Sequence, residues 1–142
     1  MSCLIDVNVW FALAVRNHAH HARVNNWFDA VSAHSAAFCR VTQAGFLRLL
    51  TNSAAMKGNA LSTKQAWSTY QALRDDERVY FATEPSGIEP LWVEYTTRVW
   101  PFPSRWTDCY LAAFARRADI TLITFDAGFL QAPGLRSEVL SN

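Results

Sequence analysis

Three aspartates occupy positions at which an α/β protein can assemble a metal site: Asp6, Asp108 and Asp126. Asp6 directly follows a short apolar run, Asp126 comes just after another, and Asp108 lies near the start of an apolar-periodic segment. Clustered carboxylates repel one another and do not all ionise unless a cation neutralises them. Mg²⁺ prefers oxygen ligands and commonly uses one or two carboxylates with several waters. The acids therefore predict a divalent-metal site suited to phosphodiester chemistry.

Each acid also has a simpler local explanation. Asp6 can serve only as the cap of the helix predicted from Val7, and Asp108 only as a first-turn acid stabilised by a helix dipole. Asp126 can be an ordinary turn residue in the segment 125–128. In open α/β sheets, ligands bind beyond the carboxyl ends of the strands. The metal-site interpretation therefore requires all three acids to reach the same edge of one sheet.

The apolar pattern predicts alternating strands and helices around these acids. We expect strands at 3–5, 35–39, 79–81 and 121–124, with an edge strand at 137–140. Helices are expected at 7–15, 20–33 and 88–100, together with three that are capped or begun by Thr42, Ser62 and Thr107. Alternation of this kind implies parallel strands with right-handed crossovers. The predicted fold is one α/β domain spanning 1–142, a three-layer α/β/α sandwich with a four- or five-stranded, mainly parallel sheet.

Composition limits the possible partners. The chain has 142 residues, and its 13 Lys and Arg against 12 Asp and Glu give a net charge of +1. Nucleic-acid binding would therefore depend on a local cluster of cations. Arg40, Arg48 and Arg105 flank the acidic segments and are candidates for phosphate contacts. Arg116 and Arg117 are more simply explained as ordinary surface charges.

Cysteine usage and hydropathy indicate a cytoplasmic protein. The three cysteines are an odd number without a CxxC pair, which argues against a disulfide framework or zinc ribbon. The N-terminus lacks the features of a signal peptide, and no apolar run approaches the ~20 residues of a membrane span. The histidines His18, His20 and His21 have no matching acid or cysteine nearby, so a solvated helix end explains them better than a metal site.

Three sequence blocks surround the acids: IDVN at 5–8, WTDCYLAA at 106–113 and LITFDAGF at 122–129. Together they resemble PIN-domain proteins, and in particular VapC-type toxins of bacterial type II toxin–antitoxin systems. The resemblance implies an endoribonuclease that uses Mg²⁺ or Mn²⁺ to cut structured RNA such as tRNA or rRNA, leaving a 5′-phosphate. It also implies a homodimer that a cognate VapB-type antitoxin inhibits.

The resemblance also implies roles for individual residues. Asp6 and Asp108 would bind the metal, and Asp126 would complete the catalytic acidic pocket. Asn8, Thr107 and Thr124 match the supporting polar positions beside the acids, where they would hold waters or the phosphate.

One position departs from the family pattern. The family usually has a Glu early in the third helix, where this chain has Gln43. An amide can still orient a water through its oxygen, but it carries no charge and cannot act as a base. An alternative therefore stays open: a catalytically inactive PIN fold that binds protein or RNA. A phosphotransfer fold fits less well, because Asn8 stands where a second Asp would be needed and no suitably placed Lys follows.

Aromatic residues gather around the Pro-rich break at 101–104. Trp92 is at helical spacing and is expected in the core. Trp100 and Phe102 adjoin the break, and we expect them to contribute to a dimer or antitoxin surface, since interfaces are enriched in aromatic residues.

Overall fold

The computed structural model describes residues 2–102 and 105–141, and its described strands form one five-stranded sheet. The strands are β1 (Cys3–Ile5), β2 (Ala36–Phe38), β3 (Val79–Phe81), β4 (Thr121–Thr124) and β5 (Ser137–Val139). Their order is β3-β2-β1-β4-β5, and every neighbouring pair is parallel. The predicted parallel sheet and its edge strand are confirmed.

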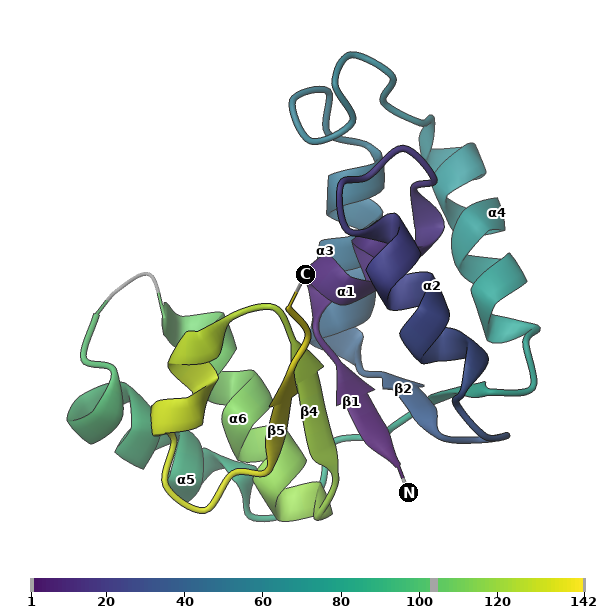
Figure 1. The fold of residues 1–142 in the computed structure, drawn as a ribbon. Helices are drawn as coiled ribbons and strands as arrows, with labels where there is room; N and C mark the ends of the chain where they lie inside the picture. The colour runs from purple at the N-terminus through teal and green to yellow at the C-terminus, as the bar shows by residue number, and fades with distance from the viewer. Residues whose placement is uncertain (1, 103–104, 142) are drawn as a thin grey trace.

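The helices cover the two faces of this sheet in separate groups (Figure 1). One face carries α1 (Val7–Ala14), α2 (His21–Asp29), α3 (Arg40–Leu50) and α4 (Thr63–Arg74). The other carries α5 (Ile88–Glu94), the π-helical η1 (Tyr95–Val99) and α6 (Trp106–Ala118), while the short 3-10 helix η3 (Ala127–Gln131) follows β4. The three-layer architecture is confirmed.

Side chains of the central strands alternate between the two cores. Ile5 and Ile123 pack with the α1–α4 group, whereas Leu4 and Leu122 pack with α5 and α6. Successive strand residues point to opposite faces, so a strand covered on both sides must be apolar throughout. This requirement explains the uninterrupted apolar runs that end just before the acids.

The helix boundaries correct several expectations. The capping box at Ser62 is confirmed. The Ser62 Oγ accepts from the Gln65 N–H at 3.1 Å, and the Gln65 Oε1 accepts from the Ser62 N–H at 2.9 Å. Thr42 does not begin α3: the helix starts at Arg40, and the Thr42 hydroxyl accepts from the Cys39 N–H at 2.9 Å. Thr107 does not cap α6, which begins one residue earlier. Backbone geometry, rather than residue type alone, determines these ends.

Other helices are shorter than their apolar patterns suggested. The predicted helix at 20–33 is limited to His21–Asp29, and the one at 88–100 is divided between α5 and η1. Within the described residues, no helix has both the length and the apolar character needed to cross a bilayer.

The topology places two strand ends side by side at the centre of the sheet. The chain runs from β1 outward through β2 and β3, and then crosses over to β4 and β5 on the other side of β1. A reversal of this kind opens a crevice at the carboxyl ends of the two central strands. Asp6 directly follows β1 and Asp126 comes shortly after β4, so this crevice brings the two acids together.

A glycine allows the helix after Asp6 to pack closely. A Cβ atom at Gly45 of α3 would lie 2.8 Å from Val7 Cγ2 at the start of α1. The absence of a side chain therefore lets α3 approach the first turn of α1, directly beside Asp6.

Candidate active site

Asp6 lies at the junction of β1 and α1 with both carboxylate oxygens engaged. Oδ1 accepts from the Val7 N–H at 2.7 Å, and Oδ2 accepts from the Thr124 hydroxyl at 2.7 Å. Only 8% of the residue is exposed. The helix-cap explanation is therefore correct for one oxygen, while the other is held by a side chain from β4.

Thr124 connects two of the acids. Its side chain is fully buried at the end of β4, where it donates to Asp6 and accepts from the Asp126 N–H at 3.0 Å. One hydroxyl thus fixes the Asp6 carboxylate relative to the backbone that carries Asp126. This linking contact differs from the water- or phosphate-holding role expected from the resemblance.

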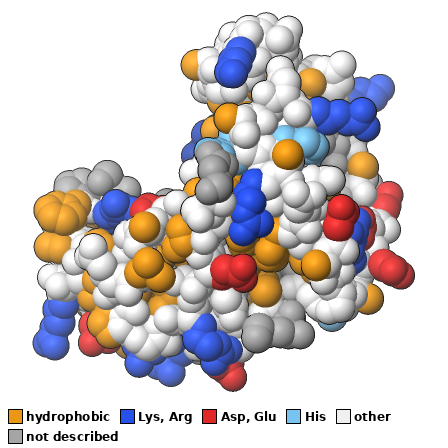
Figure 2. Space-filling model, in the orientation of Figure 1, with side chains coloured by type: hydrophobic (Ala, Val, Ile, Leu, Met, Phe, Trp, Pro, Cys, Tyr) orange, Lys and Arg blue, Asp and Glu red, His pale blue; other side chains and the backbone are white. Residues whose placement is uncertain are grey.

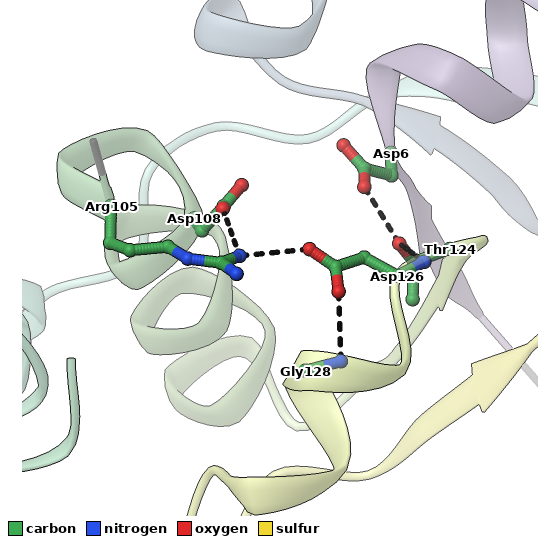
Figure 3. A network of polar contacts seen from close by, with 6 residues as sticks. All are labelled: Asp6, Arg105, Asp108, Thr124, Asp126 and Gly128. Carbon is green, nitrogen blue, oxygen red and sulfur yellow. Dashed lines mark hydrogen bonds and ion pairs between the residues drawn. The ribbon is translucent and has the colours of Figure 1, made fainter.

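Asp126 and Asp108 share a cation. Asp126 Oδ1 accepts from the Gly128 N–H at 2.8 Å, which makes it the cap of η3 as well as a site residue. Arg105 Nη1 lies 2.8 Å from Asp126 Oδ2 and 2.8 Å from Asp108 Oδ2. Figure 3 shows the carboxylates of Asp6 and Asp108 pointing toward one another from different elements, with Asp126 beside them. The structure therefore brings the three acids together.

The surroundings shift two of these carboxyl groups in opposite directions. Burial raises the pKa of Asp6 above its ordinary value, and the negative charges of Asp108 and Asp126 add to the increase against the lowering effect of its hydrogen bonds. The hydrogen bond from Gly128 lowers the pKa of Asp126, and Arg105 lowers it further. Asp126 therefore favours its ionised form more than an ordinary Asp does, whereas burial disfavours the ionised form of Asp6.

The donor set fits a magnesium-type ion held by few protein ligands. The three carboxylates offer oxygen, the donor that Mg²⁺ and Mn²⁺ prefer. In the part of the chain that is described, no group of three His, Cys, Asp or Glu is placed to hold a metal. An ion held by two carboxylates, with waters completing its coordination shell, is compatible with this geometry.

A cavity of ≈ 370 Å³ lies between α1, α3 and the start of α6, beside the elements that carry Asp6 and Asp108. Exposed Asn8, Thr107 and Arg48 line it. Asn8 and Thr107 are thus near neighbours in sequence of Asp6 and Asp108, on the side open to solvent.

Gln43 interacts with an arginine. It is buried in the first turns of α3, and its Oε1 accepts from Arg40 Nη1. The Arg40 guanidinium also lies over the Phe81 ring, 4.8 Å from the centroid. The position that is usually Glu in the family therefore orients an exposed cation at the neighbouring strand end.

Several other candidates have structural roles. Arg116 donates to the Pro133 carbonyl at 3.1 Å and Arg117 to the Gly87 carbonyl at 2.8 Å, at the end of α6 remote from Asp108. His18 accepts from the His20 backbone N–H, and the His21 ring contacts the Ala12 carbonyl. These contacts agree with the simpler explanations given to both groups.

The expectation for Trp100 was wrong, whereas Phe102 is free to act at a surface. Trp100 is only 5% exposed and packs against Tyr95 and Phe129 in the core. Phe102 is 61% exposed. Trp92 is half-buried against the same core, as expected.

Sequence reasoning did not anticipate the bridge made by Arg105 or the backbone contact made by Gly128. The second has a recognisable signal, because an Asp two residues before a Gly commonly accepts from that backbone N–H in an Asx-turn. In the bridge, the Arg105–Asp108 contact also has a local signal, because the two residues are three apart in sequence. The Arg105–Asp126 contact has none, since these two residues meet only in the folded chain.

A family model described as PIN domain matches residues 3–135. The chain belongs to the PIN-domain family. Ribonuclease VapC41 of Mycobacterium tuberculosis is 39% identical to this PIN-domain protein over 143 residues, covering 97% of this chain and 98% of VapC41. This similarity confirms the predicted resemblance to VapC-type ribonucleases.

Solved structures agree on the PIN fold. VapBC2 from Rickettsia felis, bound to a DNA fragment from its promoter, matches with a TM-score of 0.73 at 14% identity, covering 99% of this chain and 100% of that one. VapC20 from Mycobacterium tuberculosis, a sarcin-ricin loop cleaving toxin, matches with a TM-score of 0.70 at 18% identity, covering 95% and 99%. At these identities the likeness establishes the fold of the PIN domain.

Proposed function

We propose that the protein is a Mg²⁺-dependent endoribonuclease toxin that cleaves structured RNA, such as tRNA or rRNA. The observation that carries this proposal is the convergence of Asp6, Asp108 and Asp126 at the crevice between β1 and β4 (Figure 3). Mn²⁺ has the same preference for oxygen ligands and is an alternative ion. The description of VapC20 as a sarcin-ricin loop cleaving toxin supports a structured RNA substrate.

The proposed reaction is hydrolysis by water in line with the leaving 3′ oxygen. Asp6 and Asp108 would hold the ion, which supplies positive charge that polarises the phosphate and favours ionisation of water. Thr124 keeps the Asp6 carboxylate in position through its 2.7 Å hydrogen bond. Asp126, whose pKa is lowered by the Gly128 N–H, remains ionised and orients the attacking water. Fixed charges around the phosphate then stabilise the transition state.

RNA would be bound by a few local cations. Figure 2 shows blue and red side chains interspersed over the described part of the visible face, in keeping with the net charge of +1. Arg40 and Arg48 lie on α3 beside the site, where each is exposed. We assign these two cations to phosphate contacts, with Asn8 and Thr107 in the adjoining cavity.

The proposed partners are a cognate VapB-type antitoxin and a second copy of the chain, in the cytoplasm. The VapBC assembly from Rickettsia felis supports an antitoxin partner. Exposed Phe102 offers an aromatic contact for one of these interfaces. The free cysteines of the described residues are consistent with a reducing compartment.

Incubation of the purified, antitoxin-free chain with total cellular RNA tests the proposed function. With Mg²⁺ we expect discrete fragments that carry 5′-phosphate ends, and with EDTA we expect intact RNA. The ends are read by end-labelling before and after phosphatase treatment. A folded protein that cuts nothing with Mg²⁺ or Mn²⁺ would instead support the inactive binding module, for which the neutral Gln43 already provides an argument.

Replacing Arg40 by Ala should weaken RNA binding without changing the affinity for metal. Loss of one phosphate contact lowers the slope of log affinity against log salt by about 1. Gln43→Glu should have a similar effect, because a carboxylate at the position of the Gln43 amide would pair with Arg40 and neutralise it. RNA binding is measured by fluorescence anisotropy in EDTA, where no metal-dependent cleavage occurs.

The double variant Arg40→Ala/Gln43→Glu provides the control. Gln43→Glu should cause little further loss once Arg40 is Ala, since the effect acts through that arginine. If Gln43→Glu raises the affinity for Mn²⁺ and leaves RNA binding intact, position 43 belongs to the metal site and the assignment to Arg40 is wrong.

A further inference from the structure

Arg105 holds an unusual position among the acids of the site. A single nitrogen, Nη1, lies 2.8 Å from Asp108 Oδ2 and 2.8 Å from Asp126 Oδ2 (Figure 3). The two carboxylates belong to different elements, the first turn of α6 and the cap of η3. The guanidinium therefore offsets part of the negative charge of two acids that the fold brings together.

Asp6 is excluded from this arrangement. Its carboxylate accepts only neutral donors among the recorded contacts, the Val7 N–H and the Thr124 hydroxyl. The negative charges of Asp108 and Asp126 act on Asp6 from nearby. The site thus contains one internal cation for three carboxylates, and the unmatched acid is the most deeply buried of them.

The ion pairs of Arg105 with Asp108 and Asp126 are accessible to solvent, so another cation can replace the guanidinium. The side chains of Arg105, Asp108 and Asp126 are 31%, 29% and 41% exposed. Partly exposed ion pairs contribute little net stability, because water solvates the separated charges well. A divalent cation provides more charge at shorter range than one guanidinium, and the two positive groups repel each other when they share a carboxylate.

We propose that Arg105 is the internal counter-ion of the metal-free site, and that a divalent cation bound by Asp6 and Asp108 displaces it from Asp108. The inference rests on the proposed metal-dependent function and deepens it, because metal binding becomes an exchange of cations. The displaced guanidinium stays at the rim of the site, where a substrate phosphate is its natural partner. Arg105 thus competes with the metal for Asp108 in the free protein, and contacts RNA only after the metal has displaced it.

Isothermal titration with Mn²⁺ alone tests this exchange, with no RNA present. Arg105→Ala should bind Mn²⁺ more tightly than wild type, by about 5-fold or more if the coupling between the two cations is typical. Arg136→Ala is the matched control, because Arg136 forms an exposed ion pair with Asp119 at 2.9 Å on the far end of α6. Its Mn²⁺ affinity should equal that of wild type.

Thermal unfolding provides a second measurement. In EDTA, Arg105→Ala should melt slightly below wild type, since Asp108 and Asp126 lose their only recorded counter-ion among the described residues. Saturating Mn²⁺ should remove most of that difference. The proposal is overturned if Arg105→Ala binds Mn²⁺ as weakly as wild type or more weakly, or if Mn²⁺ leaves the difference in melting temperature unchanged.

These outcomes separate the inference from the proposed function. Wild-type protein that binds Mn²⁺ and cuts RNA, but whose Mn²⁺ affinity does not respond to Arg105→Ala, refutes only the exchange. A tighter Arg105→Ala variant of a protein that cuts no RNA supports the exchange and refutes the nuclease. Absence of Mn²⁺ binding in both proteins refutes both.

Discussion

Asp6→Asn should abolish metal-dependent RNA cleavage and yet leave a protein at least as stable as wild type near neutral pH in EDTA. Removal of a preorganised charged group from a catalytic site typically lowers the rate on the order of 10²–10³-fold, and Asp6 is proposed to bind the metal as well. The fold should tolerate the change, because the amide oxygen can accept from the Val7 N–H and the amide NH₂ can donate to the Thr124 hydroxyl, which donates to Asp6 in the wild type.

The stability of this variant follows from the direction of the shift in pKa. Burial raises the pKa of Asp6 in the folded protein, so the folded state favours the neutral carboxyl. The stabilising contribution of the neutral form is present below the unfolded pKa and is lost as pH rises through the folded pKa. The neutral Asn side chain does not titrate and is not subject to this loss. The stability of Asp6→Asn relative to wild type should therefore increase as pH rises, and the difference should vanish in acid.

Thermal unfolding in EDTA from about pH 3 to about pH 8 begins below the ordinary pKa of an Asp carboxyl group and measures this trend. Cleavage is followed on the RNA identified in the initial assay. Asp119→Asn is a suitable control: Asp119 is exposed, pairs with Arg136, and has a φ of 58° that Asn also accommodates. It should retain full activity. An Asp6→Asn protein with the wild-type rate would refute the assignment of Asp6 to the metal.

Thr124→Val should reduce both stability and activity, although Thr124 itself need not touch the substrate. Valine has nearly the same shape, but it leaves Asp6 Oδ2 and the Asp126 N–H without their shared partner. Leaving such buried groups unpaired costs about 1–3 kcal/mol of unfolding free energy. Chemical denaturation with urea measures this loss in EDTA.

The pH dependence distinguishes a positioning role from a merely structural one. The hydrogen bond from Thr124 lowers the pKa of Asp6, so its removal should raise that pKa further. The acidic limb of the pH–rate profile should then move to higher pH. Thr124→Ser keeps the hydroxyl and should restore the wild-type profile. A valine variant with an unchanged profile would show that the hydroxyl does not control Asp6.

The sequence by itself determined the layout of the chain. Apolar runs predicted strands at 3–5 and 121–124, and the structure places both at the centre of the sheet, covered on both faces. The alternation of strands and helices required parallel pairing, which places the acids that follow those strands at one edge. These features are encoded locally, because hydrophobic periodicity and the Ser62 capping box depend on residues close together in the chain.

Only the tertiary structure decided which side chains meet. Residue type suggested caps at Thr42 and Thr107 and a surface position for Trp100, but packing between distant elements placed all three differently. The hydrogen bond from Thr124 to Asp6 and the bridge from Arg105 to Asp126 each join residues far apart in sequence. Their geometry depends on strand register and on the direction in which each helix presents its side chains, and neither property can be read from local sequence.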